Sequence, residues 1–147
     1  MHNAVAGDST DVVKILVAHG ADIDRPTTRF GGAMGFAAHF ERRNIAAFLV
    51  PLSRDVFNLT YLGMAERLRE LFAEDPQLVN AVAPRAGITP LFCLPDDEDD
   101  AVDMTMLLLE HGGDPNAVNK EGLTATQDAR RRGLIDAADL MSGNEKV

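Results

Sequence analysis

The sequence predicts an all-α protein built as a stack of similar antiparallel helix pairs joined by short turns. Three observations support this fold class. Five segments carry apolar residues at helical spacing. Alanine, leucine and charged residues dominate, which favours helix, whereas the chain has no Trp and one Tyr. The loop that ends one of these segments also returns later in the chain in nearly the same order of residues.

The returning loop reads ILVAHGADID near the start of the chain and LLLEHGGDPNA towards its end. An apolar triplet, a His-Gly pair and an Asp correspond in both copies. The offset from His19 to His111 is 92 residues, which leaves room for two further copies at a period of about 31–33 residues. A fixed period of this size indicates a stacked-repeat architecture.

The helical segments divide the chain into five repeats within one predicted domain, 1–147. Each repeat is expected to contain two short helices, and the second is the easier one to recognise. These second helices are expected at 11–20, 44–53, 65–75, 103–112 and 135–141, and the first helices at 2–8, 32–41, 55–63, 87–94 and 122–133. The repeats then run roughly over 1–24, 25–54, 55–81, 82–117 and 118–142, with a tail at 143–147.

Particular motifs give the repeats a family resemblance. Thr89-Pro90-Leu91 is similar to the Thr-Pro-Leu-His start of an ankyrin repeat, and HGADID and HGGDPNA resemble its Gly-Ala-Asp-Val-Asn ending. The chain therefore resembles the ankyrin-repeat family over roughly residues 2–141. The resemblance implies an ankyrin-repeat solenoid with short β-turn tips, and a protein–protein interaction module that acts without catalysis.

The array departs from the family pattern in several places. Gly32-Ala33 replaces Thr-Pro in the second repeat, and Ser53-Arg54 leads directly into the next helix without a hairpin. An insertion, PDDEDDA at 95–101, separates the two helices of the fourth repeat. These departures predict a change in stacking angle after Ser53.

Charge and composition narrow the classes of partner. The net charge of −9 argues against nucleic acid or an anionic membrane as the main partner, because both attract positively charged proteins. The single cysteine, Cys93, cannot form an internal disulfide, which fits a reducing compartment. No apolar run approaches the roughly 20 residues that a membrane span needs. We therefore expect a cytoplasmic protein.

Candidate chemical sites have simpler structural interpretations. The acidic run 96–100 is expected to be a solvated turn, with Asp99 or Asp100 near the positive end of the next helix, although a basic partner or a weakly bound cation is the alternative. His19 and His111 lie about three repeats apart and cannot share a metal ion, so each is expected to pack over its own helix end. Cys93 is expected to be buried. We predict no enzyme activity, no metal and no cofactor.

The predicted binding surface is the concave face formed by the turn tips and the first helices. Aromatic and Arg residues are common interface anchors, and positive charge on this face would suit a partner with an acidic patch. The predicted contact residues are Arg25, Thr28, Arg29, Phe30, His39, Phe40, Arg42, Tyr61, Arg85, Asn119, Lys120, Arg130 and Arg131.

The first repeat supports an alternative. It begins at His2 without a preceding turn, and its sequence is apolar for a terminal repeat, which normally needs a polar outer face. Either the chain is a fragment of a longer protein, or it forms a homodimer through this uncapped N-terminal repeat.

Overall fold

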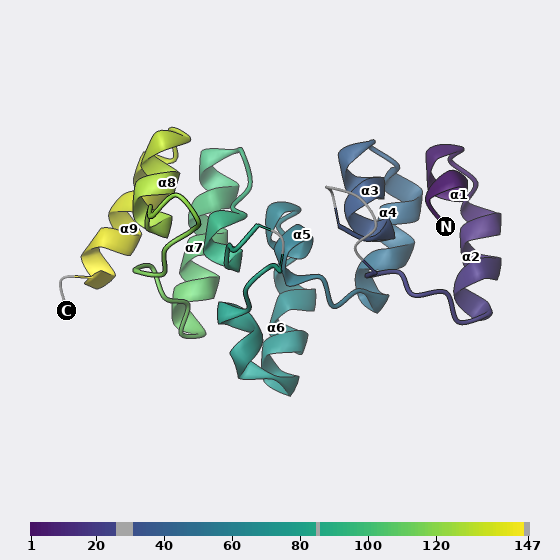
Figure 1. The fold of residues 1–147 in the computed structure, drawn as a ribbon, viewed down its shortest axis with the longest axis horizontal. Coiled ribbons are helices and arrows are strands. Elements are labelled where there is room, and N and C mark those ends of the chain that lie inside the picture. The colour runs from purple at the N-terminus through teal and green to yellow at the C-terminus, as the bar shows by residue number, and fades with distance from the viewer. Residues whose placement is uncertain (26–30, 85, 146–147) are drawn as a thin grey trace. The chain divides into compact units, whose positions relative to one another are not determined.

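The computed structural model describes residues 1–25, 31–84 and 86–145, and over these residues the chain is helical. The all-α prediction is confirmed, since no strand occurs within the described ranges and Val118 and Thr124 form an isolated β-bridge. The helices follow one another in pairs (Figure 1). They are α1 (His2–Ala6), α2 (Thr10–Ala18), α3 (Ala33–His39), α4 (Arg43–Leu49), α5 (Val56–Tyr61), α6 (Ala65–Glu74), α7 (Glu98–Glu110), α8 (Ala125–Arg131) and α9 (Ile135–Glu145), with 3-10 turns η1 (Val50–Leu52), η2 (Pro76–Asn80) and η3 (Pro90–Phe92).

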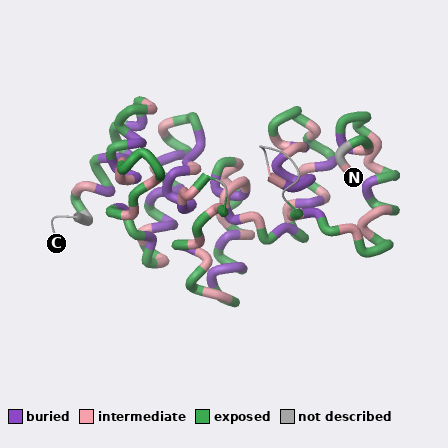
Figure 2. The backbone as a smooth tube through the Cα atoms, in the orientation of Figure 1, coloured by how far each residue is buried: buried purple, intermediate pink, exposed green. Residues whose placement is uncertain are grey.

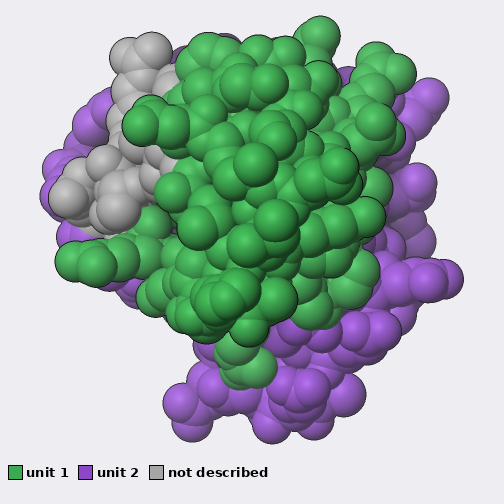
Figure 3. All heavy atoms as spheres, turned by 90° about the vertical axis from the view of Figure 1, so that its right-hand side faces the viewer, with its two compact units in different colours: residues 1–58 green, residues 59–147 purple. Residues whose placement is uncertain are grey.

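The chain divides into two compact units, Met1–Asn58 and Leu59–Val147 (Figure 3). The division falls within α5, just after the connection that lacks a hairpin. There η1 ends at Leu52 and α5 begins at Val56, as the sequence predicted. The single domain, the five repeat boundaries and the change in stacking angle stay predictions.

In the first unit, equivalent helices of two pairs pack on one another. The first helices α1 and α3 are in contact, and so are the second helices α2 and α4. Val5, Val13, Ile45 and Leu49 of these helices are fully buried, and Figure 2 colours the buried positions along the backbone purple. Because one helix pair cannot bury its own apolar face, this layer-on-layer contact is what a stacked repeat requires.

The second unit is built in the same way. The turn η3 packs against the first helix α8, and the second helices α7 and α9 pack together. Leu68, Leu71, Leu91, Leu108 and Met141 are buried at its core. Small residues allow the close approach of the last pair, because Ala137 and Ala138 of α9 are buried as well.

The helix ends that carry the repeated His-Gly pair behave as predicted. Gly20 has φ +86° and Gly112 has φ +90°, the left-handed conformation that glycine adopts without strain. The Nδ1 atoms of His19 and His111 each lie 2.8 Å from the carbonyl oxygen four residues earlier. Each histidine therefore packs over the end of its own helix.

The first helix of the fourth repeat is much shorter than predicted. We expected a helix over 87–94, and the structure shows only the three-residue turn η3. Pro90 occupies its first position, where a missing N–H is harmless. Pro95 then disfavours the helical conformation at Leu94, so the turn cannot extend.

The acidic run also differs from the prediction. It is not a turn between two helices, because α7 begins at Glu98, five residues before the expected start. The Asp97 side chain caps this helix by accepting a 3.1 Å hydrogen bond from the Asp100 N–H. Asp99 and Asp100 lie in the first turn, as expected, where the helix dipole stabilises negative charge.

Polar side chains connect successive repeats beneath the turns. Asp24 accepts hydrogen bonds from the Ser53 hydroxyl at 2.6 Å and the Arg54 N–H at 2.7 Å. Asn80 donates to the Gly112 carbonyl at 2.9 Å and accepts from the Asp114 N–H at 2.8 Å. The third repeat ends without a His-Gly pair, and Asn80 makes its link to the fourth repeat.

The carboxyl group of Asp55 begins α5 in a partly buried position. It accepts a 3.1 Å hydrogen bond from the Asn58 N–H and a 2.7 Å bond from the Asn58 side chain. Burial raises the pKa of Asp55 and the nearby charge of Asp24 adds to the rise, whereas the Asn58 hydrogen bonds oppose it. Burial therefore makes the charged form of Asp55 less stable than it would be in water.

Candidate functional site

Each helix pair has two edges where a partner could bind. We call the end where a turn or hairpin precedes the first helix the tip edge, and the end where a short loop joins the two helices the loop edge. In the first unit, Arg25 lies at the tip edge and His39, Phe40 and Arg42 lie at the loop edge, at opposite ends of α3. Seven helical residues span about 10 Å, so these predicted contacts do not form one cluster. The predicted residues Thr28, Arg29, Phe30 and Arg85 lie outside the described residues.

The loop edge of the first unit combines an exposed aromatic ring with a structural arginine. Phe40 is 45% exposed, and its ring centroid lies 4.5 Å from that of Phe36 and 5.2 Å from that of His39. Arg42 donates a 2.9 Å hydrogen bond to the carbonyl oxygen of Ala6, the last residue of α1. Arg42 therefore holds two repeats together, whereas Phe40 is presented outward.

At the loop edge of the second unit, Tyr61 is already engaged. Its hydroxyl donates a 2.6 Å hydrogen bond to one carboxylate oxygen of Asp96, and Arg132 lies 3.1 Å from the other. The Tyr61 hydrogen bond lowers the pKa of Asp96, with a further contribution from Arg132, and the same bond raises the pKa of Tyr61. Tyr61 thus connects the third repeat to the fourth.

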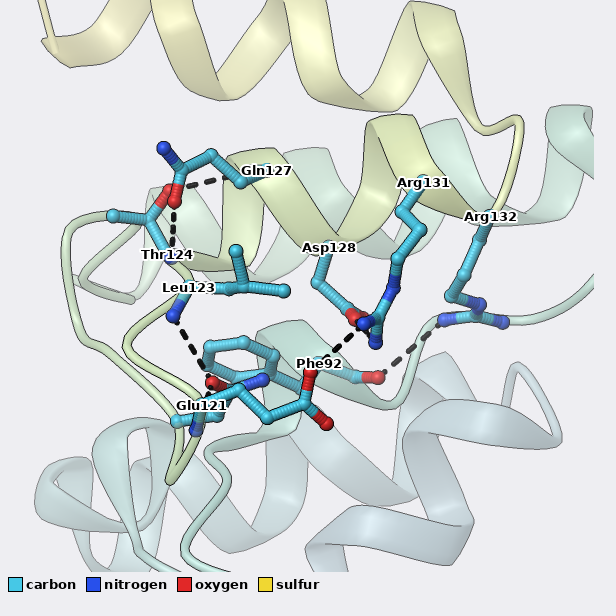
Figure 4. A network of polar contacts seen from close by, with 9 residues as sticks. Phe92, Glu121, Leu123, Thr124, Gln127, Asp128, Arg131 and Arg132 are labelled. Carbon is cyan, nitrogen blue, oxygen red and sulfur yellow. Dashed lines mark hydrogen bonds and ion pairs between the residues drawn. The ribbon is translucent and has the colours of Figure 1, made fainter.

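Arg132 donates hydrogen bonds to backbone carbonyl groups at the end of the short turn η3. Its guanidinium donates to the Leu94 carbonyl at 2.6 Å. It also approaches the Phe92 carbonyl at 3.4 Å, as Figure 4 shows. Arg42 makes the equivalent contact to Ala6 in the first unit. In both units an arginine from one repeat satisfies the carbonyl end of the preceding first helix or turn.

At the tip edge of the second unit, two hairpins lie next to one another. One is closed by a 2.8 Å hydrogen bond from the Ala83 N–H to the Ile88 carbonyl, and the other by a 2.9 Å bond from the Asn119 N–H to the Leu123 carbonyl. A Cβ atom placed on Gly87 would come within 3.0 Å of Lys120 Cγ. The Lys120 side chain therefore lies across the neighbouring hairpin.

The predicted contact residue Asn119 shapes its own hairpin. Its side-chain oxygen accepts hydrogen bonds from the backbone N–H groups of Glu121 at 2.9 Å and Leu123 at 3.1 Å. These bonds form an Asx-type turn, which fixes the backbone around Lys120.

Two other predicted arginines form ion pairs on the last repeat. Arg131 lies 2.9 Å from Glu121 and 2.7 Å from Asp128 (Figure 4), and Arg130 lies 3.0 Å from Asp139. Their positive charges are therefore matched by carboxylates of the same chain.

Sequence reasoning missed two exposed valines on the paired hairpins. Val82 is 60% exposed and Val118 is 59% exposed. Each ends the tripeptide Asn-Ala-Val, at 80–82 and at 116–118, and this repeated tripeptide was a signal that could have revealed them. We define the tip surface of the second unit as Val82, Val118, Lys120 and Glu121.

Neither Cys93 nor the acidic groups suggest catalysis. Cys93 is half-buried rather than buried as predicted, and it directly follows the last residue of η3. Its sulfur lies 3.8 Å from the Thr89 carbonyl oxygen. Among the residues that the structure describes, no group of His, Cys, Asp and Glu side chains could hold a metal ion. None of the described helices combines the length and apolar character that crossing a bilayer requires.

Comparison with known proteins supports the resemblance noted in the sequence. Residues 1–50 match the family model described as ankyrin repeats in many copies. A search of curated proteins found no match to the chain. Ankyrin repeats are generally protein-interaction modules, and their family is typically non-catalytic. Residues 1–50 are therefore similar to ankyrin repeats, and the stacked helix pairs over the described residues are consistent with an ankyrin-like repeat array.

Proposed function

We propose that the chain is a protein-binding module without catalytic activity, and that a partner contacts the tip surface of the second unit. The observation that carries this proposal is the pair of exposed valines on adjacent hairpins. Val82 and Val118 occupy equivalent positions and each exposes well over half of its surface. Exposed apolar residues on a rigid scaffold are typical of binding surfaces, because the exposed part of each side chain does not contribute to packing.

The chemistry of the tip surface defines the partner. The valines favour an apolar side chain, and Lys120, two residues after Val118, adds a positive charge that favours a carboxylate. Glu121 is occupied by its ion pair with Arg131. The partner is therefore a protein segment that presents an apolar residue next to an acidic one.

A capture experiment with matched variants tests the proposal. The tip variant is Val82→Ser, Val118→Ser and Lys120→Glu. The control carries the same types of change at other exposed positions, Leu52→Ser, Met64→Ser and Arg69→Glu. Proteins captured from cells and quantified by mass spectrometry should fall at least tenfold with the tip variant and remain with the control. Equal capture by wild type and tip variant would rule out this surface.

A second candidate function, homodimerisation, is favoured by a separate observation on α2. Val12 is 44% exposed and Ile15 is 58% exposed, three residues apart on one side of the helix. Light scattering after size exclusion should then show a dimer that Ile15→Glu converts to a monomer. A wild-type monomer at every concentration would exclude this candidate.

A further inference from the structure

An open groove runs along the packed second helices of the last two repeats. It has a volume of about 600 Å³ and is lined by Asp99, Val102 and Asp103 of α7 and by Asp136, Asp139 and Leu140 of α9. Its lining includes an apolar strip, which consists of Leu140, 38% exposed, and the half-buried Val102. Four carboxylates line the same groove.

Helix capping explains only part of this acidic lining. Asp99 and Asp136 lie in the first turns of α7 and α9, where the helix dipole stabilises them. Asp103 and Asp139 lie further along their helices and gain no such benefit. Asp139 is paired with Arg130 at 3.0 Å, whereas Asp103 has no ion pair among the described residues.

The four carboxylates give the groove a negative potential, which attracts cationic groups of a ligand. The apolar strip in the same groove would add contact area. The groove thus has the two properties that recognise a basic amphipathic segment.

The geometry also limits the conformation of the ligand. The groove is formed by two helices, so it offers no strand edge to which an extended peptide could hydrogen-bond. A helical ligand satisfies its own backbone groups and can place one apolar stripe over the groove. Met106 is 49% exposed and follows Val102 by one helical turn, which extends the apolar strip along α7.

We propose that the groove between α7 and α9 binds a basic amphipathic helix of a partner protein. The ligand lays apolar residues along Val102 and Leu140 and places Lys or Arg on either side, against Asp99 and Asp103 on one helix and Asp136 on the other. A second copy of this chain is a poor occupant, because its net charge of −9 would oppose the acidic groove. This surface is separate from the tip surface, so either proposal can fail without the other.

The experiment uses the full chain and a fluorescent synthetic peptide, LKKLLKLLKKLLKL, with an otherwise identical peptide in which every Lys is Glu. Fluorescence anisotropy measures binding. The groove variant is Asp103→Asn plus Asp136→Asn, and the control is Asp11→Asn plus Asp22→Asn in the first unit, which changes the net charge equally. A third variant, Leu140→Ser, tests the apolar strip without changing charge.

We expect the groove variant and Leu140→Ser each to weaken binding of the Lys peptide about tenfold, and the control to change it less than twofold. The Glu peptide should not bind. An equal loss with groove and control variants, or equal binding of both peptides, would overturn the proposal. Self-association that the groove variant abolishes would assign the groove to a second copy and would also overturn it.

Discussion

The fourth and fifth repeats begin with similar residues but build different first helices. Thr89-Pro90-Leu91 opens the turn η3 of three residues, whereas Thr124-Ala125-Thr126 opens the helix α8 of seven. The fourth repeat fills the space between its neighbours with the large side chains of Leu91 and Leu94, which are both buried. The fifth has the smaller residues Thr126 and Ala129 at the matching positions of a complete helix, and both are buried.

This difference shows what a stacked repeat must supply. A complete first helix is dispensable if apolar volume still fills the layer and the neighbouring repeat satisfies the exposed carbonyl groups. Arg132 of the fifth repeat provides those hydrogen bonds to η3. The stability of each repeat therefore depends on the next one, as expected for an array in which only neighbours touch.

The largest expected effect comes from making the core of the fourth repeat resemble that of the fifth. Leu94→Ala places alanine where α8 has Ala129, but η3 cannot close the space. We expect a loss of about 3 kcal/mol in the free energy of unfolding, because a cavity forms. Urea denaturation measures it. Val82→Ala, at an exposed site, should change stability by less than about 0.5 kcal/mol. Similar losses for both variants would contradict this account of the fourth repeat.

A smaller loss should follow removal of the arginine links. Arg132→Ala leaves the carbonyl groups of η3 without their donor, and we expect a cost of about 2 kcal/mol, typical of hydrogen bonds to a charged group. Arg42→Ala removes the hydrogen bond to the Ala6 carbonyl and should cost about 1 kcal/mol. Denaturation curves of both variants compare them. No loss from Arg132→Ala would show that the short turn η3 does not depend on its neighbour.

The two threonines should respond in opposite directions. Thr124 forms a capping box with Gln127, accepting from its N–H at 3.2 Å, so Thr124→Ala should cost about 1 kcal/mol. The buried hydroxyl of Thr89 has no hydrogen-bond partner among the described residues. Thr89→Val should therefore keep or increase the melting temperature, because it removes an unsatisfied polar group. A clear loss of stability from Thr89→Val would show that this hydroxyl has a structural role.

The smallest expected effect concerns Asp96 of the fourth repeat and the dependence of stability on pH. The Tyr61 hydrogen bond is the main cause that holds the pKa of Asp96 below its ordinary value of 3.8. Because the folded-state pKa is lowered, the associated stability is present above about pH 4 and is lost as the pH falls through the folded pKa. Tyr61→Phe should raise the pKa of Asp96 towards 3.8, as measured by NMR titration. An unchanged pKa would mean that Arg132 alone sets it.

Much of the fold could be predicted because its signals are local. The left-handed glycines Gly20 and Gly112, and the capping box at Thr124, depend on residues within about four positions. The helical spacing of apolar residues identified both helices in four of the repeats and the second helix in the fourth. The exception was the first helix expected at 87–94, where Pro95 prevented its extension.

The candidate site was less predictable. Tyr61 and Arg131 carry the chemistry that suggested binding, but in the structure both are engaged by carboxylates of the same chain. Val82 and Val118 looked like ordinary apolar residues, and only their exposure on paired hairpins makes them candidates. Residue types in the sequence indicate which side chains could bind a partner. Only the structure shows which of these side chains are exposed to solvent.

By itself, the sequence determined the all-α class, the repeated helix pairs and the glycine-ended turns, since these follow from spacing and backbone preference within a few residues. The tertiary structure decided the contacts that join repeats, such as those of Arg132 to Leu94, Asn80 to Asp114 and Tyr61 to Asp96. These partners are 34 to 38 residues apart. It also decided the acidic groove between α7 and α9. The physical reason is that such contacts depend on how one layer packs on the next, and no local pattern records that packing.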